Sequence, residues 1–278
     1  MIKASEFKIS ILLATYNWPS ALTLCLESLR SQTDLNFEIL IADDGSKDAT
    51  RSLIHAMSSN FPVKITHLWQ EDVGFRKSKI LNVAIERATG EYLIFLDSDC
   101  IVQSDFVAQH RLLARPSQLI TGSRILVSAQ TTQSLCPSEL SQSVARSSVD
   151  RLIRTVNLLR LRLQGGINKL LPLLIKLPHN RFRAYPAYVW RRIKGCNMSC
   201  WRGDALKIKG FDESFEGWGH EDADFVFRLE SLGIRRISGS FATEVLHLWH
   251  KTQPSDKERV NRERVLDRIQ QHRPSRLG

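Results

Sequence analysis

The residues best suited to chemistry form short polar clusters, and the clearest of these is Asp97, Ser98 and Asp99 after the apolar run 92–96. Two carboxylates where a buried strand meets solvent are costly unless a cation or hydrogen bonds pair with them. A divalent ion that joins them to a diphosphate would meet this need, because Mg²⁺ and Mn²⁺ prefer carboxylate and phosphate oxygens. A DxD triplet by itself is more often a turn, so the metal interpretation depends on its context.

Two further clusters follow apolar runs: Thr15, Tyr16 and Asn17 after residues 8–14, and residues 43–46 (DDGS) after 37–42. A carboxylate in the second cluster can accept hydrogen bonds from a base or a ribose. Asp-Gly-Ser is also a common turn and the start of a helix cap. The turn needs only one acid, so two consecutive acids favour contact with a ligand.

The segment 217–224 (GWGHEDAD) precedes the helical run 225–229. Acids near a helix N-terminus are stabilised by its dipole, which explains part of the pattern. The two glycines around Trp218 suggest a loop that closes over a flat group such as a sugar ring. Glycosyl transfer with inversion needs one carboxylate to accept the proton of the attacking hydroxyl, and an acid of this loop is a candidate.

His247 and His250 follow the β-like run 244–246. A single histidine is more often a core or surface residue than a ligand. Two of them in a protein with a DxD triplet favour a nitrogen ligand to the metal, and imidazole favours Mn²⁺ over Mg²⁺.

The elements that must position these clusters alternate. Residues 8–14, 37–42, 63–69 and 92–96 read as strands, and 20–30 and 77–88 carry apolar residues at helical spacing. This order predicts an α/β domain whose parallel sheet is covered by helices on both faces. Because ligands of open α/β sheets bind at the carboxyl ends of the strands, the three clusters mark one crevice.

Residues 129–193 differ from the rest and read as a basic, partly helical insertion. Leu152, Val156, Leu159 and Leu163 form a stripe flanked by arginines, which suits a helix lying on a membrane and equally a helix covering a protein core. We take residues 1–250 as one catalytic domain that includes this insertion, and 251–278 as a charged C-terminal tail, solvated or frayed.

Composition limits the classes of function. Lys and Arg number 39 against 29 Asp and Glu, a net charge of +10 that attracts nucleotides, nucleic acid or anionic lipid. No apolar run suits a signal peptide or a spanning helix, which predicts a cytoplasmic or peripheral protein. The five scattered cysteines favour reduced thiols. The basic residues do not alternate with aromatic residues on a recognisable platform, so we predict no nucleic-acid partner.

Four segments together resemble glycosyltransferase family 2 with the GT-A fold, a Rossmann-like nucleotide-binding sheet. They are residues 9–17 (ISILLATYN), 37–46 (FEILIADDGS), 88–99 (ATGEYLIFLDSD) and 217–222 (GWGHED), and their order extends the resemblance over residues 8–250. The last of them and residues 72–79 (DVGFRKSK) are similar to the branch with bacterial chondroitin-type polymerases and the carboxyl-terminal galactosyltransferase module.

The resemblance implies a UDP-sugar donor, Mn²⁺ or Mg²⁺, and inversion at the anomeric carbon. The acceptor would be a glycan or lipid-linked glycan of bacterial surface polysaccharide or lipopolysaccharide synthesis, and the sugar a hexose or N-acetylhexosamine. Asp222 would be the catalytic base, with Glu221 as the alternative. The nucleotide would contact Thr15, Tyr16, Asn17, Asp44, Arg76, Lys79, Asp97 and Ser98. The metal ligands would be Asp97, Asp99 and His247, and the acceptor would meet Trp218, Gly219 and Asp224.

Three positions depart from the family pattern. Ala14 stands where many members have a hydroxyl-bearing residue. Leu81 stands before Asn82 where arginine is frequent, which shifts the expected nucleotide contacts to Arg76 and Lys79. His220 replaces a common glycine in the closing loop. Two other classes of function remain: a nucleotide-sugar-binding module without catalysis, and a basic adaptor at a membrane surface. Retention of the acids and His247 together argues against the first, since such a module needs no base. A location on the inner face of the cytoplasmic membrane fits the predicted acceptor.

Overall fold

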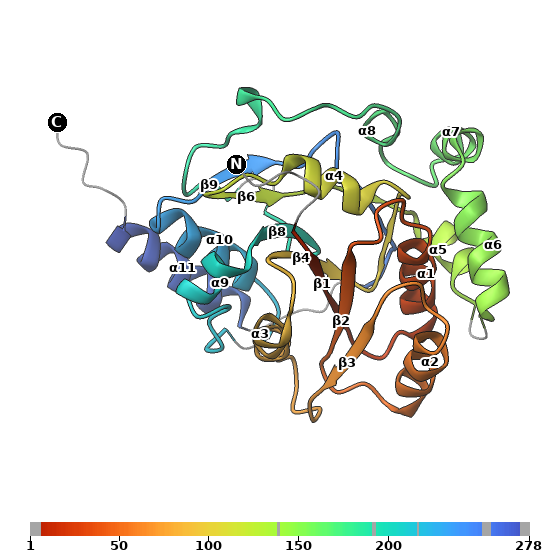
Figure 1. Ribbon diagram of the computed structural model, residues 1–278, viewed down its shortest axis with the longest axis horizontal. Helices are drawn as coiled ribbons and strands as arrows, with labels where there is room; N and C mark the ends of the chain where they lie inside the picture. Colours follow the sequence, from red (N-terminus) through yellow and green to blue (C-terminus); the bar gives the residue numbers. More distant parts are fainter. Residues whose placement is uncertain (1–6, 138–139, 191–192, 216, 252–256, 273–278) are drawn as a thin grey trace.

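A computed structural model describes residues 7–137, 140–190, 193–215, 217–251 and 257–272. Its central feature is a seven-stranded sheet with the order β3-β2-β1-β4-β8-β6-β9 (Figure 1). The first four of its strands in the chain are parallel, and β8 is antiparallel to both of its neighbours. The strands are β1 (Ile9–Thr15), β2 (Phe37–Asp43), β3 (Ile65–Trp69), β4 (Tyr92–Asp97), β6 (Gln118–Thr121), β8 (Asn197–Trp201) and β9 (Arg235–Ser238).

Both faces of this sheet are buried, which explains why its strands are apolar runs. Successive side chains point to opposite faces, so Ile11 and Leu13 pack under one helical layer while Leu12 packs under the other. The first layer is formed by α1 (Pro19–Arg30), α2 (Asp48–Ser58) and α4 (Phe106–Leu113). The second is formed by α3 (Lys77–Arg87), α9 (Arg202–Lys207), α10 (Glu221–Ser231) and α11 (Glu258–His272). The predicted α/β fold class is therefore confirmed.

A second, three-stranded sheet brings distant parts of the chain together at the edge of the first. Its order is β5-β10-β7, made of β5 (Cys100–Val102), β10 (Val245–His247) and β7 (Arg124–Leu126). The antiparallel register of β10 on β5 places His247 opposite Cys100. Since β5 begins directly after Asp99, this pairing carries the predicted histidine to the DxD triplet.

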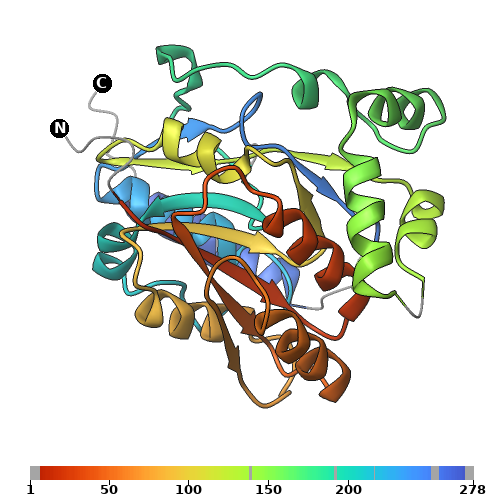
Figure 2. The same cartoon turned by 45° about the vertical axis from the view of Figure 1, so that its right-hand side comes forward.

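The insertion forms short helices on the side of α1 (Figure 2). They are α5 (Ala129–Leu135), α6 (Gln142–Leu152), α7 (Thr155–Leu163) and α8 (Leu171–Leu174), followed by the 3₁₀ turn η1 (Arg181–Arg183). Where one stripe from Leu152 to Leu163 was expected, the structure breaks the helix between α6 and α7. Leu152 is buried, whereas Val156 and Leu163 are 78% and 79% exposed. The part of the stripe that lies on α7 does not cover a core, because Leu158 and Leu161 are the α7 residues that pack inward.

The C-terminal segment is not the solvated tail that its charge suggested. Val265 and Ile269 of α11 are buried against α10 and the second helical layer. Their four-residue spacing places them on one face of the helix, while most of the charged side chains lie on the other. Within the described residues, no helix is both long and apolar enough to cross a membrane.

Candidate functional site

The three predicted clusters meet at the carboxyl ends of β1, β2 and β4. In the parallel register Thr15 lies opposite Asp43 and Ala14 opposite Asp97. The Asp44 amide donates to the carbonyl of Thr15 at 3.1 Å, and the Ser98 amide donates to that of Ala14 at 2.9 Å. The polar residues therefore emerge from adjacent strands at one edge, as the strand order predicted.

The two consecutive acids after β2 have different roles. Asp43 is fully buried and accepts hydrogen bonds from the Ser46 amide at 2.8 Å and His67 Nε2 at 2.9 Å, so it supports the turn. Asp44 accepts from Gln70 Nε2 at 2.5 Å and from the Arg76 amide at 2.8 Å. Burial raises the pKa of Asp44 despite these bonds.

Polar atoms around Asp44 lack partners. Thr15 Oγ1, Gln70 Oε1 and Arg76 Nε are buried and form no hydrogen bond within the described part of the chain. A buried polar group without a partner costs about 1–3 kcal/mol, so such a group near a crevice calls for an explanation. The hydrogen-bonding edge of a base and its ribose would supply the missing donors and acceptors.

Tyr16 supplies an aromatic ring at this edge of the sheet and is 52% exposed. Its hydroxyl donates to Asp72 Oδ2 at 2.9 Å, which fixes the ring on the surface. Asn17 receives the Lys47 amide on Oδ1 at 2.9 Å and so ties the first loop to the second. An exposed ring held in place beside Asp44 can stack on a flat base at little cost in entropy.

Lys77, at the start of α3, was not predicted as a site residue. Its ammonium donates to Asp97 Oδ1 at 2.5 Å. Burial lowers the pKa of Lys77, but the charges of Asp97 and Glu221 outweigh this effect and raise the pKa above its usual value. Lys79, which was predicted, is exposed two residues farther along α3. Lys77 therefore carries the positive charge between the DxD triplet and the acids of α10.

Asp99 lies in the group that is best suited to a metal. His247 Nε2 is 3.5 Å and His250 Nε2 is 3.2 Å from Asp99 Oδ2. The three side chains each offer a ligand atom, and these atoms lie within 4.8 Å of one another. Burial would raise the pKa of Asp99, but the His250 hydrogen bond and the charge of His247 outweigh it, so its pKa is lowered. One carboxylate and two imidazoles form a mixed oxygen and nitrogen set that suits Mn²⁺.

Of the predicted metal ligands, the structure brings Asp99 and His247 together and adds His250. Asp97 instead forms an ion pair with Lys77. His250 was not among the predicted ligands, although it belongs to the pair of histidines that favoured a nitrogen ligand.

Glu221 and Asp222 begin α10, and Glu221 is near enough to Lys77 for their charges to interact. Asp222 Oδ2 accepts the Gly195 amide and Oδ1 accepts the Ala223 amide, both at 2.8 Å. Glu221 is buried and accepts the Gly219 amide at 3.2 Å. Burial, with a further contribution from the charge of Asp222, raises the pKa of Glu221 to about 7, although Lys77 acts in the other direction.

The raised pKa of Glu221 predicts a pH-dependent gain in stability for Glu221→Gln. Between pH 4.5 and 7 the folded protein holds the Glu221 proton more tightly than the unfolded chain does, so its stability falls as the pH rises. The glutamine variant does not titrate at this position. Its free energy of unfolding, relative to that of the original chain, should therefore be about 2 kcal/mol higher at pH 8 than at pH 5. Urea unfolding at both pH values measures the difference. An equal change at both would contradict the raised pKa.

The loop before α10 is held by the C-terminal helix. His220 adopts φ 72°, in the left-handed region that favours glycine, which accounts for the glycine common at this position in the family pattern. His220 Nε2 lies 2.6 Å from Glu258 Oε1, and Asn261 Nδ2 donates to the Gly219 carbonyl at 3.1 Å. Trp218, next to these residues, is 47% exposed and free to meet a ligand.

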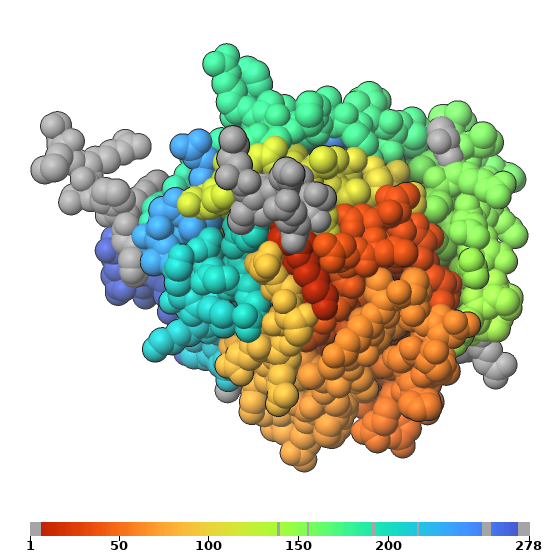
Figure 3. All heavy atoms as spheres, in the orientation of Figure 1, coloured from red at the N-terminus to blue at the C-terminus, as the bar shows by residue number. Residues whose placement is uncertain are grey.

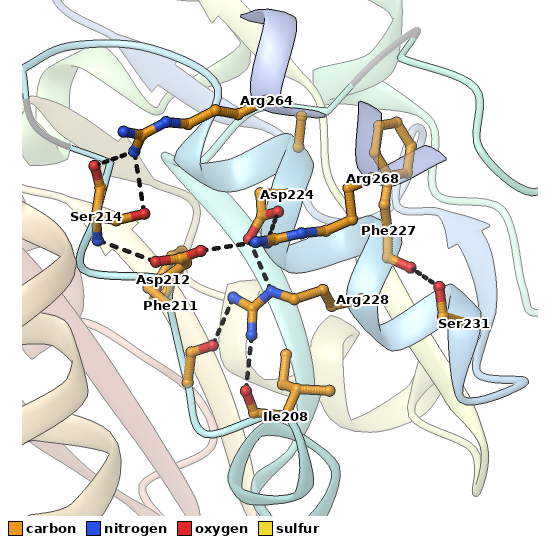
Figure 4. Close-up of polar contacts among 12 residues, drawn as sticks. Ile208, Phe211, Asp212, Ser214, Asp224, Phe227, Arg228, Ser231, Arg264 and Arg268 are labelled. Carbon is orange, nitrogen blue, oxygen red and sulfur yellow. Dashed lines mark hydrogen bonds and ion pairs between the residues drawn. The ribbon is translucent and has the colours of Figure 1, made fainter. Parts of the chain in front are cut away.

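Asp224, predicted to contact the acceptor, lies elsewhere. It is fully buried between the guanidinium groups of Arg228 and Arg268 (Figure 4). Arg268 also pairs with Asp212 at 2.8 Å, so α11 is joined to both α10 and the segment before it. With no exposed surface, Asp224 can position the α10 acids but offers nothing to an acceptor.

Arg268→Ala should therefore destabilise the protein by about 2 kcal/mol. This is less than the usual cost of breaking a buried ion pair, because Arg228 still neutralises Asp224 and because Arg268 is partly exposed. Arg264→Ala is the control, since this exposed residue bonds only Ser214 across the same interface. Urea unfolding compares the two. Equal small losses would show that the buried carboxylate does not depend on α11.

Two protein-family models match parts of this chain. Residues 10–135 match the family model described as glycosyl transferase family 2, and residues 178–251 match the one described as the N-terminal domain of galactosyltransferase. Over 232 residues the chain is 27% identical to validoxylamine A glucosyltransferase of Streptomyces hygroscopicus, which covers 81% of this chain and 52% of that protein.

A longer match is to hyaluronan synthase of Pasteurella multocida, 25% identical over 262 residues, or 92% of this chain and 26% of that one. The chain thus spans about half, or less, of the length of these relatives. The solved structure of GalNAc-T7 with UDP, GalNAc and Mn²⁺ has a TM-score of 0.61 at 15% identity, over 94% of this chain and 48% of that one. At this level of identity the likeness concerns the fold.

Proposed function

We propose that this chain, in which residues 10–135 match the family model of glycosyl transferase family 2, transfers a hexose or N-acetylhexosamine from a UDP-sugar to a glycan of a bacterial surface polysaccharide or lipopolysaccharide, with inversion. The observation that carries this proposal is that Lys77 pairs with Asp97 and interacts with the charge of Glu221, while Asp99, at the other end of the same triplet, is grouped with His247 and His250. A module that only binds nucleotide sugars has no use for a buried acid whose pKa lies near 7.

The donor nucleotide would lie across the first three loops. Tyr16 would stack on the uracil, Asp44 would accept its N–H, and the unpaired Thr15 Oγ1 would bond the nucleoside. Asn17 and Ser98 line the ribose side, and Lys79 and the Arg76 guanidinium are available to the diphosphate. UDP in the complex of GalNAc-T7 is consistent with a uridine donor on this fold.

A divalent ion fits the residues present. Asp99, His247 and His250 would hold it, with Asp97 on the side that faces Lys77. When bound, such an ion supplies positive charge to the diphosphate as the bond to the sugar breaks. Lys77 adds a second, permanent positive charge beside Asp97, and the low exposure of Asp99 keeps water from weakening these interactions.

In the transfer, a carboxylate of α10 accepts the proton of an acceptor hydroxyl while that oxygen attacks the anomeric carbon. The bond from this carbon to the diphosphate oxygen breaks, its electron pair leaves with UDP, and the single displacement inverts the configuration. Asp222 is assigned as the base, and Glu221 is the alternative. Trp218, on the loop before these acids, would contact the acceptor sugar, whereas the predicted contact through Gly219 is not proposed, because this residue is buried and its amide and carbonyl bond Glu221 and Asn261.

A panel of UDP-sugars, with GDP-mannose as the non-uridine control, tests the proposal through release of the nucleotide diphosphate with Mn²⁺ or with EDTA. We expect metal-dependent hydrolysis of one or a few UDP-sugars, which identifies the donor before the acceptor is known. Tight UDP binding without turnover on any donor, even with added oligosaccharide acceptors, would favour the non-catalytic module. Preference for GDP-mannose would overturn the uridine assignment.

A further inference from the structure

The insertion leaves an unusual number of apolar side chains on the surface. Eight large apolar residues between Val156 and Phe182 are exposed, and two of them, Leu163 and Phe182, are 79% and 82% exposed. The others are Val156, Leu159, Leu171, Leu174, Ile175 and Leu177. Water-exposed apolar groups at this density are unfavourable unless something covers them.

These residues follow one edge of the molecule. The chain from α7 through α8 to η1 runs along the upper rim in both ribbon views (Figures 1 and 2), and its green and teal atoms form the same rim in the space-filling view (Figure 3). We call residues 156–182 the rim segment. The rest of the insertion, α6 above all, packs against α1 and anchors the rim segment to the catalytic domain.

The same region is positively charged, which favours an anionic partner. Residues 140–190 contain nine Lys and Arg and one acid, Asp150. Arg154, Arg160 and Arg162 are exposed beside the apolar side chains of α7, and Arg181 lies 5.0 Å from the ring of Phe182. Apolar groups flanked by arginines match the layering of an anionic bilayer, in which acyl chains lie beneath negatively charged headgroups.

A pocket lies between the rim segment and β7, a strand of the second sheet. It has a volume of about 310 Å³ and is lined by Lys169 and Pro172 from the rim segment and by Arg124 and Lys194 from the domain. Arg124 lies opposite Val245 in the register of β7 on β10, two residues before His247. The pocket offers a lipid-borne acceptor three basic residues and one acid, Glu244, beside the strand that carries His247.

We infer that the rim segment docks the enzyme on an anionic lipid bilayer, with Leu163 and Phe182 inserted among the lipids and Arg160 and Arg162 at the headgroups. The inference deepens the proposed function by adding a membrane-held acceptor. It depends on that function only for the identity of the acceptor, because lipid binding is measured without donor or acceptor.

The test is co-sedimentation of the full chain with phosphatidylcholine vesicles, with and without phosphatidylglycerol. We expect binding that requires phosphatidylglycerol and weakens with salt. The variant Arg160→Glu with Arg162→Glu should bind at least about 20-fold more weakly, since each basic residue contributes roughly fivefold near such a surface. Leu163→Ser with Phe182→Ser should lose about tenfold or more.

Matched controls carry the same changes elsewhere: Arg87→Glu with Arg262→Glu, and Leu206→Ser with Leu232→Ser, all at exposed positions. They should bind vesicles as the original chain does, and every variant should hydrolyse the donor normally. Equal loss in the controls, or no binding to anionic vesicles, overturns the inference. A dimer in solution that Leu163→Ser with Phe182→Ser converts to monomer would show that a second copy covers the rim segment instead.

Discussion

Asp99→Ala should abolish both the transfer activity and its dependence on a divalent ion. Asp99 is the only carboxylate among the described residues grouped with both His247 and His250, so its loss leaves two neutral or partly protonated imidazoles. Without the ion, negative charge on the departing diphosphate is not neutralised. We expect turnover to fall by at least about 10³-fold. Removing one hydrogen-bond donor to a developing negative charge typically lowers turnover about 10²–10³-fold, and losing a divalent ion should lower it more.

UDP release with Mn²⁺ and with excess EDTA measures this effect, and paramagnetic resonance of Mn²⁺ in the presence of UDP measures binding separately. Asp150→Ala removes the same charge at an exposed site and should change neither. His250→Ala should weaken Mn²⁺ binding if this histidine joins the site. Turnover by Asp99→Ala near that of the original chain in excess EDTA would refute the metal assignment.

Asp222→Asn should separate the base from binding. The amide keeps the size of the side chain but cannot accept the acceptor's proton, so turnover should fall about 10²–10⁴-fold with little change in UDP affinity. Asn can accept only one of the two backbone hydrogen bonds now made by Gly195 and Ala223, which predicts a loss of stability of about 1 kcal/mol. Steady-state rates, calorimetric titration with UDP and Mn²⁺, and urea unfolding measure the three effects.

Glu221→Gln is the necessary comparison, because the pKa of Glu221, about 7, also suits a general base. If Asp222→Asn turns over within a few-fold of the original chain while Glu221→Gln is inactive, the base is Glu221. If Asp222→Asn binds UDP much more weakly, its role is structural, and the contact with the Gly195 amide is the first explanation.

Local sequence determined the nucleotide-binding half of the protein. The first four strands begin and end within about two residues of the expected positions, since short apolar runs bounded by polar residues are typical of strands buried on both faces. Parallel pairing then brings Thr15, Asp44 and Asp97 to one edge without further information. For these residues, the position at the end of a strand in the sequence also determines where they lie in the fold.

The tertiary structure decided the rest, because the remaining roles depend on contacts between distant segments. Sequence pattern cannot distinguish Lys77 from Lys79, and only the packing of α3 turns the first toward Asp97. Asp224 and Asp222 look alike in the sequence, but two arginines, one of them from α11, bury the former. The high charge of residues 258–272 hid the two apolar residues that dock this helix. From the sequence, the arginine-flanked leucines of α7 fit a core position and a surface position equally well. Their exposure depends on which face of the helix packs inward, and periodicity alone does not identify that face.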